Sequence, residues 1–141
     1  PGNWGNVTLC GGGNGGSGLR TQIADGYGGS MSALQTLQTD PGAKVGPVNQ
    51  GFADLLAASS DNYASWVPGD KDPRAVVVPL VDFAGCNGQC TVTVKGFMSF
   101  YIDSYNGGAI TGHFISMVEQ NSVKVVATTD AGLSGNPYLI K

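Results

Sequence analysis

Residues 74–118 read RAVVVPLVDFAGCNGQCTVTVKGFMSFYIDSYNGGAITGHFISMV, and this stretch decides the fold. It contains three apolar, β-rich runs, which cover residues 75–83, 91–101 and 109–118. Asn-Gly sequences stand at both junctions, at residues 87–88 and 106–107. Such residues adopt the positive φ angles of tight reversals. The stretch therefore predicts an antiparallel meander of three strands.

Alternation within this stretch indicates which side chains face the core. Val92 and Val94 alternate with Thr91, Thr93 and Lys95, so we expect the two valines on the buried face. Pro79 lies inside the first run and has no N–H to donate to a neighbouring strand. This strand is therefore expected to lie at an edge of the sheet or to carry a bulge.

The sequence before the meander predicts one short strand and two helices. Residues 3–9 are typical of a strand, and the glycine-rich segment 10–18 lacks the Lys-Ser/Thr that ends a phosphate-binding loop. A first helix is expected from an N-cap at Ser17 to Gly26. A second is expected over 47–58, with Pro47 at its first position and with an apolar stripe made by Val48, Phe52, Leu55 and Leu56.

Two segments carry weaker patterns. Residues 27–42 are expected to be irregular or partly extended, and residues 122–129 alternate as SVKVVATT, which is typical of one more strand. The predicted fold is a single α+β domain. It is mainly an antiparallel sheet, packed by one or two short helices, with an extra C-terminal strand.

Composition excludes several classes of function. Charged residues make up 12% of the chain, against about 25% in an ordinary soluble domain. The net charge is −3 and the seven basic residues are scattered, whereas nucleic-acid binding needs a clustered basic surface. No run reaches the roughly 18 apolar residues of a membrane-spanning helix. We expect neither a nucleic-acid partner nor a membrane span in this chain.

Few side chains are suited to catalysis or metal binding. The chain has one histidine, His113, and one glutamate, and no recognisable nucleophile–base spacing. His113 is expected to be a structural residue, partly exposed or hydrogen-bonded. The loop 59–73 carries Asp61, Asn62, Asp70 and Asp72, but it matches no complete calcium-binding pattern, so its charges are expected to be solvated. We expect no enzyme, cofactor or metal.

The three cysteines suggest an oxidising compartment. Cys86 and Cys90 flank Asn87-Gly88-Gln89, which predicts a disulfide across a turn. Pairing of Cys10 with one of them is the alternative; otherwise Cys10 is free, buried or intermolecular. Disulfides persist mainly outside the cytosol. The chain also begins at Pro1, as expected of a secreted chain after processing or of a trimmed sequence, and we expect an extracellular or cell-surface location.

Six blocks of sequence, in order over residues 3–118, carry a resemblance to a known family. They are NWGNVTL, LRTQIADGYGG, TDPGAKVGPVNQGFADLL, DPRAVVVPLVDF, TVTVKGFMSFYI and GGAITGHFISMV. Together they resemble the extracytoplasmic domain of Tad-type (Flp) pilus-assembly proteins, the TadE/TadG-like group. The resemblance implies an exported prokaryotic protein tied to surface pili, without enzymatic activity or catalytic residues. It covers residues 1–118 as a domain and leaves 119–141 as a C-terminal extension.

The function expected from these features is that of a structural subunit of a self-assembling surface filament. The alternative is a pilus-associated accessory or adhesive binding domain. Copies of the same chain are the expected partners, because the extension offers an alternating segment that can extend a sheet. The residues expected to mediate assembly are Val123, Val125, Ala127, Tyr138, Leu139 and Ile140.

Overall fold

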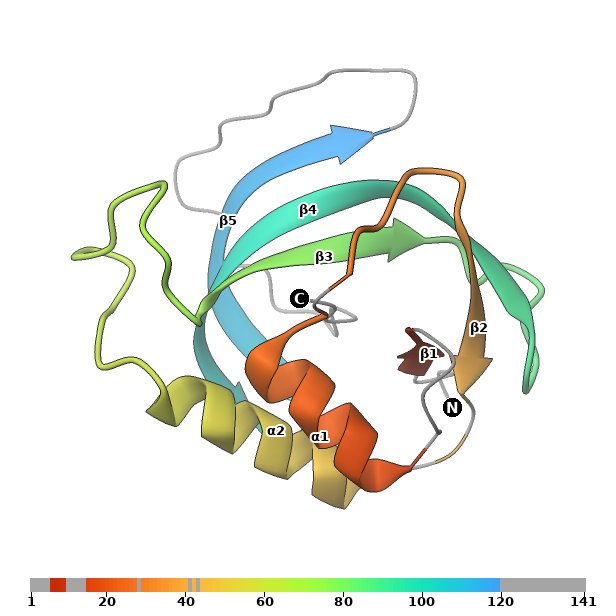
Figure 1. The fold of residues 1–141 in the computed structure, drawn as a ribbon, viewed down its shortest axis with the longest axis horizontal. Helices are drawn as coiled ribbons and strands as arrows, with labels where there is room; N and C mark the ends of the chain where they lie inside the picture. Colours follow the sequence, from red (N-terminus) through yellow and green to blue (C-terminus); the bar gives the residue numbers. More distant parts are fainter. Residues whose placement is uncertain (1–5, 10–14, 28, 41, 43, 120–141) are drawn as a thin grey trace.

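A five-stranded antiparallel sheet and two helices make up the described part of the chain (Figure 1). The computed structural model describes residues 6–9, 15–27, 29–40, 42 and 44–119. The elements in chain order are β1 (Asn6–Thr8), α1 (Gly16–Asp25), β2 (Thr36–Asp40), α2 (Val45–Ala57), β3 (Ala75–Val81), β4 (Thr91–Asn106) and β5 (Ala109–Glu119). The fold is α+β and mainly sheet, as predicted. The extra C-terminal strand expected over 122–129 lies outside the described residues.

The long strand β4 organises the sheet. β3 pairs with its residues 94–101 and β5 with its residues 96–106, so these two strands lie on opposite edges of β4. β2 pairs with residues 91–93, and β1 pairs with β2. Strands β3, β4 and β5 form the predicted meander.

The predicted end of β4 at Tyr101 was too early, because the strand continues to Asn106. Residues 102–106 include several polar side chains, and a bulge at Asp103 interrupts the alternation of the strand. The apolar/polar alternation that would predict a strand is therefore absent from this part of the sequence. The strand ends at the Gly107-Gly108 turn, in which both residues have positive φ (56° and 97°). Two positive φ angles define the type I′ turn, whose twist matches that of a hairpin.

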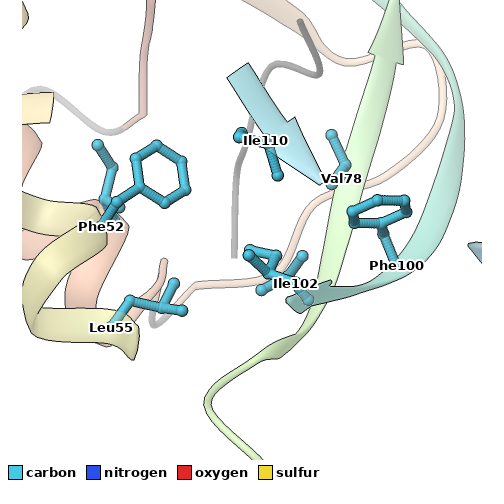
Figure 2. Close-up of a cluster of buried hydrophobic side chains, with 8 residues drawn as sticks. Phe52, Leu55, Val78, Phe100, Ile102 and Ile110 are labelled. Carbon is cyan, nitrogen blue, oxygen red and sulfur yellow. The ribbon is translucent and has the colours of Figure 1, made fainter. Parts of the chain in front are cut away.

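The main core lies between the helices and the inner face of the sheet (Figure 2). Phe52 and Leu55 of α2 face side chains that come from three strands, namely Val78 of β3, Phe100 and Ile102 of β4, and Ile110 of β5. A second cluster lies toward the other end of β4 and contains Val7, Leu9, Leu37, Val92 and Val94. The side chains of Val92 and Val94 therefore lie on the buried face, as predicted.

Both helices depart slightly from the predicted bounds. α2 begins at Val45, so Pro47 is its third residue and not its first. α1 has Gly15 at its N-cap, and Ser17 lies inside its first turn without a capping hydrogen bond. The helix α1 therefore begins two residues earlier than a serine cap suggested. Its end at Gly26, which has a φ of 83°, is as predicted.

The segment 27–42, expected to be irregular or partly extended, contains a regular strand. Leu37 and Thr39 of β2 are buried at 4% and 3% exposure, while Thr36 and Gln38, which alternate with them, are exposed. The apolar/polar alternation is hidden at the sequence level because one of the two buried positions is a threonine. Thr39 is buried by its hydrogen bonds to the 86–90 turn.

Candidate functional site

An aromatic loop covers part of the outer face of the sheet. Phe100 and Ile102 belong to the main core, so Tyr101 between them points to the opposite face. Tyr101 is nevertheless fully buried, at 0% exposure. The rings of Tyr63 and Trp66, from the loop between α2 and β3, lie 5.7 Å and 5.5 Å from its ring centroid. This loop therefore packs onto the face of the sheet that the helices leave uncovered.

Hydrogen bonds to Asp72 fix the loop to the sheet. Tyr101 donates its hydroxyl proton to Oδ2 of Asp72 at 3.1 Å, and Ser59 donates to the same oxygen at 3.2 Å. The backbone N–H of Arg74 donates to Oδ1 at 2.8 Å. Asp72 is only 8% exposed, so the expectation that all charges of this loop are solvated was wrong at this residue. A buried carboxylate is tolerated because three donors satisfy it.

The environment of Tyr101 also changes its acidity. Burial, followed by the hydrogen bond to Asp72 and the charge of that carboxylate, raises the pKa of Tyr101 to about 12. A phenolate there would lose its hydration and would face an anion. The hydroxyl therefore stays protonated at neutral pH, and it acts as a donor that ties strand to loop.

Arg74 connects the same loop to the end of α2. One of its terminal nitrogens donates to the carbonyl oxygens of Leu56 and Ser59, at 3.0 Å and 2.9 Å. The last carbonyls of a helix have no partner within the helix, so an arginine that reaches them caps the helix end. The loop is thus held at α2, at Asp72 and at Tyr101.

A pocket lies where this loop meets β4 and β5. The ring of Tyr63 stacks on His113, with centroids 4.0 Å apart and planes 7° from parallel. Nε2 of His113 lies 3.0 Å from Oδ2 of Asp103. The cavity has a volume of about 630 Å³ and is lined by Asn62, Tyr63, Ala64, Trp66, Pro68, Asp103 and His113. His113 is partly exposed, as the sequence predicted, and its partner at 3.0 Å is the carboxylate of Asp103.

Asp103 reaches this pocket because of a bulge. Ile102 pairs with Gly112 and Ser104 pairs with Thr111, so Asp103 is the additional residue of β4 between these two pairs. Bulges re-aim side chains, and here the carboxylate turns toward His113 of the neighbouring strand. Gly112 is required beside it, since a Cβ at this position would lie 1.9 Å from the carbonyl oxygen of Tyr101.

The pocket combines ring faces with polar atoms, and His113 is the one basic side chain among the described residues that line it. Three polar groups in its lining hydrogen-bond to no other described residue: the hydroxyl of Tyr63, the side-chain N–H₂ of Asn62 and Oδ1 of Asp103. Oδ1 of Asn62 accepts from the backbone N–H of Ser65 at 3.2 Å. No group of three or more metal-ligating side chains occurs in the described part of the chain. The arrangement is suited to binding a small polar molecule.

The edges of the sheet differ in what they offer to a partner. Within the described residues, β3 and β5 each pair only with β4. The backbone carbonyl of Arg74 accepts a hydrogen bond from the backbone N–H of Ile102 at 2.9 Å. Because backbone groups alternate in direction along a strand, those of Ala75, Val77 and Pro79 point away from β4. Of these, Pro79 has no N–H, and the N–H of Ala75 bonds to Asp72 at 3.0 Å. The strand also has a register shift at Leu80/Val81. Pro79 therefore lies on an edge strand next to a bulge, as predicted.

The predicted disulfide between Cys86 and Cys90 is present, with a Cα–Cα distance of 5.9 Å. The turn that it closes is attached to β2. The N–H of Cys90 donates to Oγ1 of Thr39 at 2.8 Å, and that hydroxyl donates to the carbonyl of Gly88 at 3.1 Å. The disulfide therefore stabilises the connection between β3 and β4 as well as the contact of that connection with β2.

The sequence analysis did not predict that the residues of the pocket lie together. Tyr63 and Trp66 are two aromatic residues in an otherwise polar loop, and this was the available signal. Asp103 gave none, because the bulge that aims it depends on strand pairing. The predicted assembly residues Val123, Val125, Ala127, Tyr138, Leu139 and Ile140, like Cys10, lie outside the described residues.

Comparison with protein-family models, with curated proteins and with solved structures finds no match to this chain. None of the helices formed by the described residues is long and apolar enough to cross a bilayer.

Proposed function

We propose that this chain is a non-enzymatic, extracellular structural subunit that assembles with copies of itself into a surface filament. The observation that carries the proposal is the open outer edge of β5, which pairs only with β4 among the described residues. An open edge is a template for strand addition by another chain. On the other outer edge, that of β3, the outward N–H of Val77 lies between Ala75, whose N–H is bonded to Asp72, and Pro79, which has no N–H.

Further support comes from the chemistry of the chain. The Cys86–Cys90 disulfide is typical of an oxidising compartment. The resemblance of residues 3–118 to the TadE/TadG-like domains of Tad-type pilus-assembly proteins favours an exported protein of the pilus machinery. The low charge content of 12% reduces repulsion between like subunits.

The proposed contact joins the C-terminal segment of one subunit to β5 of the next. Val123, Val125 and Ala127 alternate with Lys124, Val126 and Thr128, and such an alternation suits a strand that is added to an edge. Repetition of a head-to-tail contact gives an open fibre when the rotation between subunits does not close a ring. The apolar end at Tyr138, Leu139 and Ile140 is assigned to the same contact.

Single lysine substitutions test which edge is used. Val118 of β5 and Val77 of β3 are both 49% exposed, and Val45 in the first turn of α2 is 63% exposed. A lysine on an edge strand opposes strand addition, and at these exposed positions it changes stability by only about 0.5 kcal/mol. Val118→Lys is expected to suppress filaments in negative-stain microscopy, while Val77→Lys and the control Val45→Lys still form them.

A shortened chain ending at Glu119 tests the role of the extension. It is expected to unfold cooperatively and to remain monomeric. Filaments formed by this chain, or by Val118→Lys at undiminished yield, would contradict the proposed contact. A stable monomer that hides β5 under its own residues 120–141 would contradict it as well.

The pocket supports a second candidate function, that of a pilus-associated accessory or adhesive binding domain. Its aromatic faces lie in one cavity with polar groups that bond to no other described residue, and residues of this kind are enriched at ligand sites. A monomer that binds a ligand without polymerising favours this candidate over the first.

A further inference from the structure

We propose that the pocket formed by Asn62, Tyr63, Trp66, Asp103 and His113 binds a neutral sugar. This inference rests on the binding-domain function proposed above and does not depend on whether the chain polymerises. It starts from a cavity of about 630 Å³, which is large enough for a monosaccharide or a terminal disaccharide unit.

The rings of the pocket are suited to the apolar face of a pyranose. The electron-rich face of an aromatic ring attracts the slightly positive C–H groups of a sugar ring, and the two flat surfaces gain dispersion contacts. Trp66 and Tyr63 both line the cavity, with centroids 6.3 Å apart and planes 30° from parallel. Trp66 is held by its indole N–H, which donates to the carbonyl of Asp70 at 3.2 Å. The ring is therefore oriented before any ligand binds.

The polar groups match the hydroxyls of a sugar. A hydroxyl both donates and accepts, so it needs acceptors and donors in the same site. Oδ1 of Asp103 is an acceptor, the side-chain N–H₂ of Asn62 is a donor, and the hydroxyl of Tyr63 is either. The other oxygen of Asp103 is held by His113 at 3.0 Å. The carboxylate is thus fixed in place by its neighbour, which lowers the entropic cost of binding.

Charge distinguishes a neutral sugar from other small ligands. Among the residues that the structure describes, no Lys or Arg lines the cavity, so a uronic acid or a phosphate would lack a cationic partner there. A quaternary ammonium ligand requires ring faces that surround it. Here one face of Tyr63 is covered by His113, in a stack with a 7° interplanar angle. These features leave an uncharged ligand with one flat apolar side as the best fit.

The test uses the full chain and ligand titrations followed by the indole N–H signal of Trp66 in NMR spectra. The neutral probes are glucose, galactose, N-acetylglucosamine and their β-linked disaccharides. Glucuronic acid is the anionic probe and choline is the cationic probe. At least one neutral probe is expected to shift the signal with a Kd in the millimolar range, because a ligand of this size makes few contacts to offset the entropic cost of binding.

Two variants assign the binding to this pocket. Tyr63→Ala removes a ring, which is expected to weaken binding roughly three- to tenfold. Asp103→Asn keeps the size of the side chain, which guards against simple loss of folding, and is also expected to weaken binding. The control Val67→Ala changes an exposed residue of the same loop that does not line the cavity, and its Kd should equal that of the parent chain.

Each other outcome decides against the proposal. If choline or glucuronic acid binds and no neutral sugar does, the proposed ligand class is wrong, but the binding-domain function still stands. Absence of any shift with every probe overturns both. A sugar that binds Asp103→Asn, Tyr63→Ala and the parent chain equally places its site elsewhere and overturns the assignment.

Discussion

Tyr101→Phe tests whether the loop between α2 and β3 is held to the sheet by the Tyr101–Asp72 hydrogen bond. The substitution removes one oxygen and leaves the ring, so the contacts with Tyr63 and Trp66 remain. The lost bond is 3.1 Å long, goes to a carboxylate and is buried. Hydrogen bonds to charged groups contribute about 1.5–3 kcal/mol. Because Ser59 and the N–H of Arg74 still satisfy Asp72, we expect a loss of about 1.5 kcal/mol, at the low end of that range.

The pH dependence gives an independent check with a definite sign. The pKa of Tyr101 is raised to about 12 in the folded chain, against about 10 in an unfolded one. Stability that depends on the protonated hydroxyl is therefore complete below pH 10 and is lost as the pH rises toward 12. The loss amounts to no more than about 2 to 3 kcal/mol. Tyr101→Phe should lack this alkaline component.

The assay is urea-induced unfolding of the parent chain and of Tyr101→Phe, at pH 7 and at intervals from pH 9 to 11.5. The control is Tyr63→Phe, which removes a hydroxyl that bonds to no other described residue and should leave the midpoint nearly unchanged. The reasoning is refuted if Tyr101→Phe matches the parent at pH 7, or if the two curves remain parallel up to pH 11.5.

Three further predictions concern stability. Phe52→Ala, in the core between α2 and the sheet, should cost about 3–5 kcal/mol in denaturant unfolding; a loss under about 1 kcal/mol would indicate an exposed face. Gly112→Ala should cost about 1–3 kcal/mol or prevent folding, because its Cβ meets the carbonyl of Tyr101. Its control is the helical Gly46→Ala, which has open space around its Cβ and should be neutral or stabilising in the same denaturant unfolding experiment. Replacing Cys86 and Cys90 together by serine should cost roughly 2 kcal/mol or less, because the closed loop is short; three alkylatable thiols in the unreduced parent chain would instead disprove the disulfide.

The sequence was informative wherever local pattern and packing agree. The meander followed from three β-rich runs and two Asn-Gly junctions, and the helix near residues 45–57 followed from the spacing of Val48, Phe52 and Leu55. Those segments bury apolar side chains at regular intervals, so their periodicity survives in the sequence. The disulfide could be predicted because Cys86 and Cys90 flank a turn.

The residues that could not be predicted depend on contacts distant in sequence. Thr39 is buried because it hydrogen-bonds to a turn 49 to 51 residues away, and its polar side chain conceals the pattern of β2. Asp72 is buried because Tyr101 and Ser59 satisfy it. Asp103 enters the pocket only because β4 and β5 pair with a bulge. No local signal distinguishes these residues from exposed polar ones.

The most direct test of the proposed assembly is the concentration dependence of the sedimentation of the purified 141-residue chain, with the same samples imaged by negative stain. We predict that polymers grow with concentration, that filaments appear in the images, and that Val118→Lys shifts the chain to the monomer while Val45→Lys does not. A single species of 14.4 kDa at every concentration, without filaments, would contradict the account.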